Sequence, residues 1–79
     1  MLINIQYFAI LREQAGRPNE SLETRAATPA ALYAELAKRY PFTLAPEQLK
    51  VAINGEFADF AHSLNTGDAV VFIPPVAGG

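Results

Sequence analysis

The chain has 79 residues, a formal net charge of −2 and no cysteine. This length favours a single small domain over residues 1–79, and the lack of cysteine excludes disulfides and thiolate metal sites. The scattered lysines and arginines argue against nucleic-acid binding, and neither a leader nor a membrane-length apolar run is present, so we expect a cytoplasmic protein without membrane contact.

The first 25 residues predict two strands and a short helix. Residues 1–8 alternate, with Ile3, Ile5 and Tyr7 on one face, which is typical of a half-buried strand. Residues 10–15 contain helix formers and end at Gly16, a typical residue after a helix C-terminus. Residues 20–25 alternate weakly and are polar, so we expect an edge strand that pairs with the first strand in antiparallel fashion.

A longer helix is predicted from Pro29 to about Tyr40. Thr28 suits the N-cap position and Pro29 the first helical position. Pro41 ends the helix, because the residue before a proline avoids the α region. Helical spacing places one apolar stripe on the core side of this helix: Leu32, Leu36, Ala37 and Tyr40.

The second half predicts one short turn near residues 45–48 and three more strands. The Asn54-Gly55 pair joins a strand at 50–53 to a short return arm at 56–60, since both residues tolerate positive φ. Residues 69–73 are nearly all apolar, as expected for a central strand covered on both faces. Val70 with Phe72 form one face, and Val71 with Ile73 form the other. One face must meet the helix, and the other is a partner surface if nothing in the chain covers it. The predicted core consists of Ile3, Ile5, Leu32, Leu36, Ile53, Val70 and Phe72.

A tail is predicted at residues 74–79. Pro74 and Pro75 stiffen its start, because proline fixes φ and lacks an N–H. Gly78 and Gly79 carry no Cβ, so the backbone can enter a slot too narrow for side chains. Six extended residues reach roughly 20 Å, which would carry the α-carboxylate of Gly79 into the active site of another protein.

The sequence offers no catalytic machinery of its own. It contains no glycine-rich phosphate-binding loop and no paired base and nucleophile. His62 has no second histidine or cysteine to join it in a metal site. We therefore expect that this chain is not an enzyme and binds no cofactor, and that another protein supplies any ATP chemistry.

The order of elements predicts an α+β two-layer domain, in which one main helix packs on a mixed sheet. This is the β-grasp arrangement of ubiquitin-like proteins, with the last strand beside the first at the centre. The sequence resembles the MoaD family, the small sulfur-carrying subunits of molybdopterin synthase. The resemblance covers the whole chain and rests on these segments: Phe8-Ala9, Arg12-Glu13, Gly16, residues 51–54, Gly67-Asp68 and, above all, residues 72–79.

The resemblance implies a function as a sulfur carrier in molybdenum cofactor biosynthesis. A ubiquitin-activating-like adenylyltransferase would use ATP to adenylate the carboxylate of Gly79, and a sulfur donor would convert the adenylate to a thiocarboxylate. The tail would then enter the large synthase subunit, where sulfur passes to cyclic pyranopterin monophosphate. The resemblance also implies a heterotetramer of two small and two large subunits. Gly79 would be the reactive group, and Gly78 would provide clearance.

Partner-binding residues are predicted on the body and on the tail. Phe57 and Ile73 match apolar partner-facing positions of the family, while Phe60 is either a third anchor or a core residue. On the tail, the predicted contacts are Pro74, Pro75, Val76 and Ala77. Arg12 and the pair Lys38-Arg39 are either solvated surface charges or contacts to the activating enzyme. Three alternatives stay open: a thiamine-pathway sulfur carrier, a ubiquitin-like modifier that joins Gly79 to lysines, and a plain interaction module.

Overall fold

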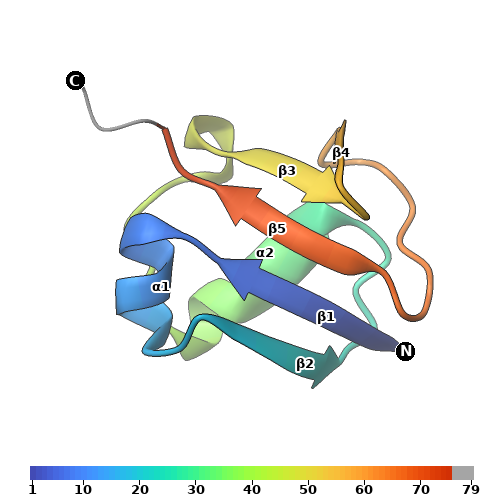
Figure 1. Cartoon of the computed structure of the whole chain (residues 1–79), viewed down its shortest axis with the longest axis horizontal. Coiled ribbons are helices and arrows are strands. Elements are labelled where there is room, and N and C mark those ends of the chain that lie inside the picture. Colours follow the sequence, from blue (N-terminus) through green and yellow to red (C-terminus); the bar gives the residue numbers. More distant parts are fainter. Residues whose placement is uncertain (76–79) are drawn as a thin grey trace.

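The computed structural model describes residues 1–75, in which a five-stranded sheet carries one long helix on one face (Figure 1). The strands are β1 (Leu2–Tyr7), β2 (Asn19–Glu23), β3 (Lys50–Ile53), β4 (Glu56–Ala58) and β5 (Ala69–Ile73). The helices are α1 (Ala9–Ala15) and α2 (Pro29–Arg39), and a 3₁₀ turn, η1 (Pro46–Gln48), precedes β3. The spatial order is β2-β1-β5-β3-β4, with β1 and β5 parallel and the other pairs antiparallel. The predicted β-grasp arrangement, with the last strand beside the first, is confirmed.

The local sequence signals act where they were predicted. The Thr28 hydroxyl accepts a hydrogen bond from the Ala31 N–H at 3.2 Å, which caps the start of α2. Tyr40 is already extended and is followed by Pro41, so α2 ends at Arg39. Gly16 adopts a φ of 75° after α1, and Gly55 adopts 87° in the turn between β3 and β4. The return arm β4 stops at Ala58, two residues earlier than predicted.

All seven predicted core residues are buried between α2 and the sheet. The stripe on α2 differs from the prediction at its rim, because Pro29 and Tyr33 are buried while Ala37 is exposed. Successive residues are rotated by about 100° around the helix axis, so the mean direction of the buried side chains lies between Leu36 and Tyr40. The side chain of Ala37 is rotated about 80° away from that direction. Its short side chain does not reach the sheet from there. The prediction for Ala37 is therefore wrong, and Tyr33 fills that part of the layer.

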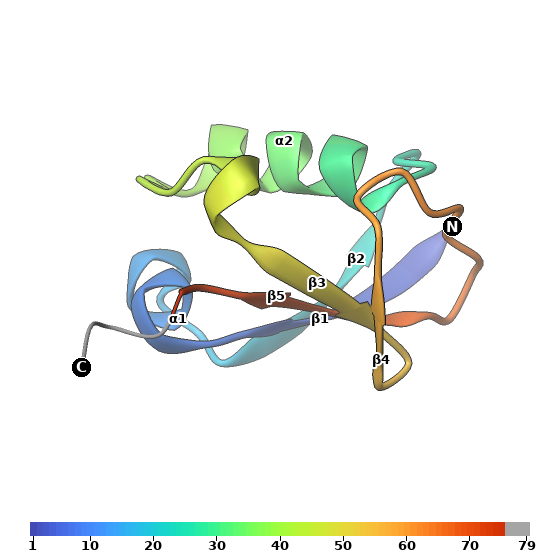
Figure 2. The same ribbon diagram turned by 90° about the horizontal axis from the view of Figure 1, so that it is seen from above.

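Only one face of the sheet is covered by the described part of the chain. Figure 2 shows α2 running across one side of the sheet, while Figure 1 looks onto the opposite side. On β5, Val70 and Phe72 are fully buried against α2, but Val71 and Ile73 are only half-buried and Ala69 is exposed. Within residues 1–75 this strand is covered on one face only, because α2 packs on a single face of the sheet. The alternative, that the other face is a partner surface, stays a prediction. We call the other side the open face.

Within residues 1–75, no helix has the length and apolar character that crossing a membrane would require.

Candidate functional site

The predicted tail begins where β5 leaves the centre of the sheet. Ile73 and Pro74 are half-buried there, and Pro75 is exposed. Val76, Ala77, Gly78 and Gly79 lie outside the described residues, so their assigned roles stay predictions. The structure thus shows the start of the tail at residues 73–75, which we call the tail root, and the surfaces that surround it.

A row of side chains crosses the open face next to this root. Gln6, Val71, Ala52 and Phe57 are paired in register on four neighbouring strands. Phe57 ends the row on edge strand β4 with 73% of its surface exposed, the highest value among the large apolar residues in positions 1–75. Ile73 lies one pleat further along β5, opposite Lys50. The two predicted anchors, Phe57 and Ile73, therefore belong to one surface that leads towards the tail.

Lys50 places a positive charge beside the aromatic anchor. Its Nζ atom lies 5.9 Å from the centroid of the Phe57 ring, near the outer limit of a cation–π contact. An exposed pair of this kind contributes little to folding, but it presents an apolar ring and a cation together to any protein that covers the open face.

A polar clamp holds the hairpin that carries Phe57. The Asn54 side-chain amide donates to Asp68 Oδ1 at 2.9 Å, and Asn54 Oδ1 accepts from the Ala69 N–H at 2.9 Å. Asp68 is buried and also accepts from the Asn65 N–H at 2.8 Å. The Asn65 N–H and then the Asn54 amide lower the pKa of the Asp68 carboxyl, because they stabilise its charged form. The clamp fixes the β3–β4 turn against the start of β5 and so fixes the direction of Phe57.

An apolar groove lies at the root of the tail and was missed by the sequence analysis. It is lined by Phe8, Ala9, Ile10, Leu44, Ile73, Pro74 and Pro75. Phe8 and Ile10 are 45% and 38% exposed, which is unusual for large apolar residues. The spacing of α1 contains the missed signal: Leu11 and Ala15, four residues apart, form the buried face, and Ile10 therefore points elsewhere.

Backbone strain accompanies this groove. Ala9 has a φ of 50°, in the left-handed region that costs a non-glycine residue about 1 kcal/mol or more. This conformation turns the chain from β1 into α1 within one residue. Phe8 stays extended just before the turn and remains exposed beside the tail root.

Phe60 lies between the core and the surface. Its ring stacks on that of Phe72 at a centroid distance of 6.1 Å, and it is only half-buried. Its carbonyl accepts a hydrogen bond from the Ala30 N–H at the start of α2. Phe60 thus packs on the helix side of the sheet rather than on the open face. Its role as a third partner anchor stays a prediction.

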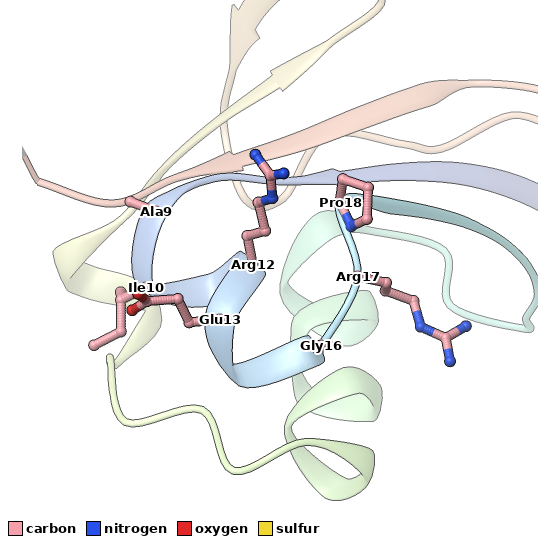
Figure 3. Close-up of a pocket in the computed structure, with 7 residues that line it drawn as sticks. All are labelled: Ala9, Ile10, Arg12, Glu13, Gly16, Arg17 and Pro18. Atoms are coloured by element: carbon pink, nitrogen blue, oxygen red, sulfur yellow. The ribbon is translucent and has the colours of Figure 1, made fainter.

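A second hollow beside α1 is lined by charged side chains (Figure 3). Arg12 and Arg17 extend from it in different directions, and both point away from Glu13. Arg17 Nη1 lies 3.6 Å from Glu20 Oε1. Arg12 forms no ion pair among the described residues. The cationic groups near the tail root are therefore only partly neutralised.

Buried acid–base groups in the described region serve the fold. Tyr7 and Tyr40 both donate to Glu20 Oε2 at 2.6 Å. Burial alone would raise the pKa of Glu20, but the hydrogen bonds from Tyr40 and Tyr7 outweigh it and lower that pKa. Burial and the hydrogen bond to Glu20 raise the pKa of the Tyr7 hydroxyl. Within residues 1–75, no set of His, Cys, Asp or Glu side chains is arranged to hold a metal ion, and His62 is exposed.

Comparisons with known proteins identify relatives of nearly the same length as this chain. The model of the ThiS family matches residues 5–79. The molybdopterin synthase sulfur carrier subunit of Escherichia coli K12 is 33% identical over 81 residues, which cover 99% of this chain and all of that protein. The subunit of the same name from Mycobacterium tuberculosis H37Rv is 34% identical, with 98% and 96% covered. SAMP1 of Haloferax volcanii, a small archaeal modifier protein, superposes over the whole of both chains with a TM-score of 0.81 and 26% identity.

Proposed function

Because the chain belongs to the ThiS family, we propose that it is the sulfur carrier subunit of a molybdopterin synthase, with Gly79 as the group that carries the sulfur. One observation carries the proposal: the similarity to the named sulfur carrier subunits extends from end to end, and the family match includes the last residue, Gly79. The position of the tail root beside an exposed apolar surface supports it. We infer that the predicted resemblance to the MoaD family reflects common function.

The proposed chemistry begins with activation of the terminal carboxylate. A free carboxylate is anionic at neutral pH and therefore a poor electrophile. One of its oxygens attacks the α-phosphorus of ATP in a ubiquitin-activating-like adenylyltransferase, and pyrophosphate leaves. A hydrosulfide equivalent then attacks the carbonyl carbon, AMP leaves, and a proton is lost. The product is a thiocarboxylate on Gly79.

The loaded carrier then delivers its sulfur in the large synthase subunit. There the thiocarboxylate sulfur displaces an oxygen substituent of cyclic pyranopterin monophosphate, and water then cleaves the acyl–sulfur bond, which restores the carboxylate of Gly79. Two loaded carriers act in turn because a dithiolene contains two sulfurs. The body of this chain contributes docking rather than catalysis. The open face, with Phe57 and Ile73, and the groove with Phe8 and Ile10 are the surfaces that the large subunit would cover. Docking makes the transfer effectively intramolecular.

The assembly would contain two small and two large subunits. Phe57 is the main anchor in this proposal, because it is 73% exposed in the free chain and aromatic residues, Phe included, are enriched at the cores of interfaces. The rings of Pro74 and Pro75 fix φ, so holding these two residues in a partner loses less backbone entropy than the about 1–2 kcal/mol per residue that is typical of other residues.

Changes at the tail test this function. Deleting Gly79 moves the carboxylate about 3.5 Å back along an extended chain, and a displacement of about 1 Å already costs on the order of 100-fold in rate. Adding one residue after Gly79 misplaces the group in the other direction. Gly78→Val introduces a branched side chain where the slot would fit none. We expect all three variants to melt like wild type, to bind the large subunit and to form almost no molybdopterin.

The assay contains the activating enzyme, ATP, a sulfide source, the large subunit and the pyranopterin precursor. Ala34→Val introduces the same branched side chain on the exposed side of α2 and is the control, which should form product normally. Near-normal product from the Gly79 deletion would contradict the proposal. The likeness to SAMP1 favours a protein modifier as the second candidate. In that case the intact mass from native cells would show no sulfur in place of an oxygen, and conjugates of high molecular weight would be present.

A further inference from the structure

The charged side chains of this protein are separated between its two ends. The tail end contains the C-terminal ends of β1, β5 and α2 and the start of β3, and the opposite end contains the β3–β4 turn and the N-terminus (Figure 2). Five of the six lysines and arginines lie at the tail end: Arg12, Arg17, Lys38, Arg39 and Lys50.

The elements that carry these five cationic residues place them at the tail end. Arg12 belongs to α1, which begins directly after β1, and Arg17 contacts Glu20 at the start of β2. Lys38 and Arg39 lie in the last turn of α2. The next residue is Tyr40, whose hydroxyl donates a hydrogen bond to Glu20.

The acidic residues have the opposite distribution. Five of the eight belong to the far end: Glu23, Glu35, Glu56, Asp59 and Asp68. The far end has a single arginine, Arg25, besides the N-terminal ammonium group, which contacts Glu23 at 3.3 Å. At the tail end Glu13, Glu20 and Glu47 offset part of the positive charge, and Glu20 is already engaged by Arg17 and two tyrosine hydroxyls. The tail end therefore has five cationic side chains against three acidic side chains and the α-carboxylate of Gly79, a small positive excess, although the side chains of the whole chain sum to −2.

From this separation we propose that the protein which receives the tail carries a ring of acidic side chains around the mouth of its tail-binding channel, and that the cationic tail end steers the carrier into it tail first. The inference rests on the proposed function, in which the large synthase subunit receives the tail. Among the described residues, Arg12, Lys38, Arg39 and Lys50 have no ion-pair partner of their own, so they remain able to attract acidic groups of another protein.

The size of the molecule makes the two ends electrostatically independent. Its longest extent is 35 Å, and at 0.1 M salt the charges of a surface are screened beyond about 10 Å. A partner that approaches the tail end therefore meets a positive field, while the negative far end is screened from it. Steering of this kind raises association rates by about 10- to 1,000-fold between fully complementary surfaces, with little effect on dissociation.

Two matched arginine variants test the inference. Arg39→Glu and Arg25→Glu each change the charge by the same amount, on exposed side chains at opposite ends of the molecule. The association rate of the full chain with the large subunit is measured by stopped flow at about 20 mM and about 500 mM NaCl, where screening is weak and strong, respectively. Lys38→Glu serves as a second tail-end variant, and thermal melting confirms that each variant is folded.

We expect Arg39→Glu and Lys38→Glu to lower the association rate about 3- to 10-fold at low salt, with the dissociation rate nearly unchanged and the difference lost at high salt. Arg25→Glu should change the rate less than about 2-fold, because its charge lies at the opposite end of a molecule whose longest extent is 35 Å, which exceeds the screening length of roughly 20 Å at the lower salt concentration. Equal effects of Arg39→Glu and Arg25→Glu, or a loss that persists at high salt, would overturn the inference while leaving the sulfur-carrier function intact. Wild-type protein that fails to bind the large subunit at either salt concentration would overturn the proposed function itself, and the inference with it.

Discussion

Replacing Glu20 should destabilise the fold more than replacing Glu23, the other charged residue of β2. Its carboxylate joins three elements, because it accepts hydrogen bonds of 2.6 Å from Tyr7 on β1 and from Tyr40 at the end of α2. Only 9% of the side-chain surface is exposed, so water does not easily replace these partners. The Tyr7 ring is fully buried and would keep an unpaired hydroxyl if the carboxylate were removed.

The size of the effect follows from these contacts. A hydrogen bond to a charged group contributes about 1.5–3 kcal/mol, and a buried group left unpaired costs about 1–3 kcal/mol. Tyr40 is only half-buried and can turn towards water, so we expect Glu20→Ala to lower the free energy of unfolding by about 2–4 kcal/mol. For a domain of this size that corresponds to a fall in Tm of at least about 8 °C.

Thermal and urea unfolding measure this loss, and the neighbouring Glu23 supplies the control. Glu23 lies on the same strand with 77% of its side chain exposed, and its carboxylate forms an ion pair with the N-terminal ammonium group. Glu23→Ala should change stability by about 0.5 kcal/mol or less. If Glu20→Ala melts no lower than Glu23→Ala, the hydrogen bonds to Tyr7 and Tyr40 do not stabilise the fold as argued.

The same network predicts a dependence on pH. The folded-state pKa of Glu20 is lowered, so its stabilisation is fully present above the unfolded pKa of about 4.3 and is lost as the pH falls through the folded pKa. The stability difference between wild type and Glu20→Gln should therefore be constant above about pH 5 and shrink in stronger acid. Asp68, whose pKa is also lowered, is present in both proteins, and its contribution cancels in the difference. A difference that stays constant down to about pH 2 would refute the assignment.

Two further predictions concern the core and the docking surface. Leu36 on α2 is completely buried against the sheet, and Leu36→Ala should lower the free energy of unfolding, measured with urea, by about 2–5 kcal/mol. An unfolding midpoint equal to that of wild type would show that Leu36 is not a core residue. Phe57→Ala and Ile73→Glu change the open face, so each should raise the Kd for the large subunit by about 10-fold or more while the isolated chain stays folded. Unfolding of either variant, or binding as tight as wild type, would show that the residue is assigned wrongly.

Short-range patterns in the sequence determined the elements and much of the core. Thr28-Pro29, Gly16 and Asn54-Gly55 act through backbone sterics and hydrogen bonds to near neighbours, so their effects can be predicted without knowing the rest of the fold. The alternation of Ile3, Ile5 and Tyr7 likewise selects one face of β1 whatever strand lies beside it. Phe57 and Ile73 are predicted as anchors through family resemblance; both lie on the open face, and their role as anchors stays a prediction.

Contacts between distant parts of the chain were decided only by the tertiary structure. The exposure of Phe8 and Ile10 depends on the positive φ of Ala9 and on where Leu44 and the tail root come to lie. The bonds from Tyr7 and Tyr40 to Glu20 join residues 13 and 20 positions apart. The separation of charge between the two ends cannot be read along the sequence, where cations and acids are interspersed as far as Lys50. It arises because the sheet order and the direction of α2 bring the last turn of α2, α1 and the start of β3 to the end of the sheet where the tail begins.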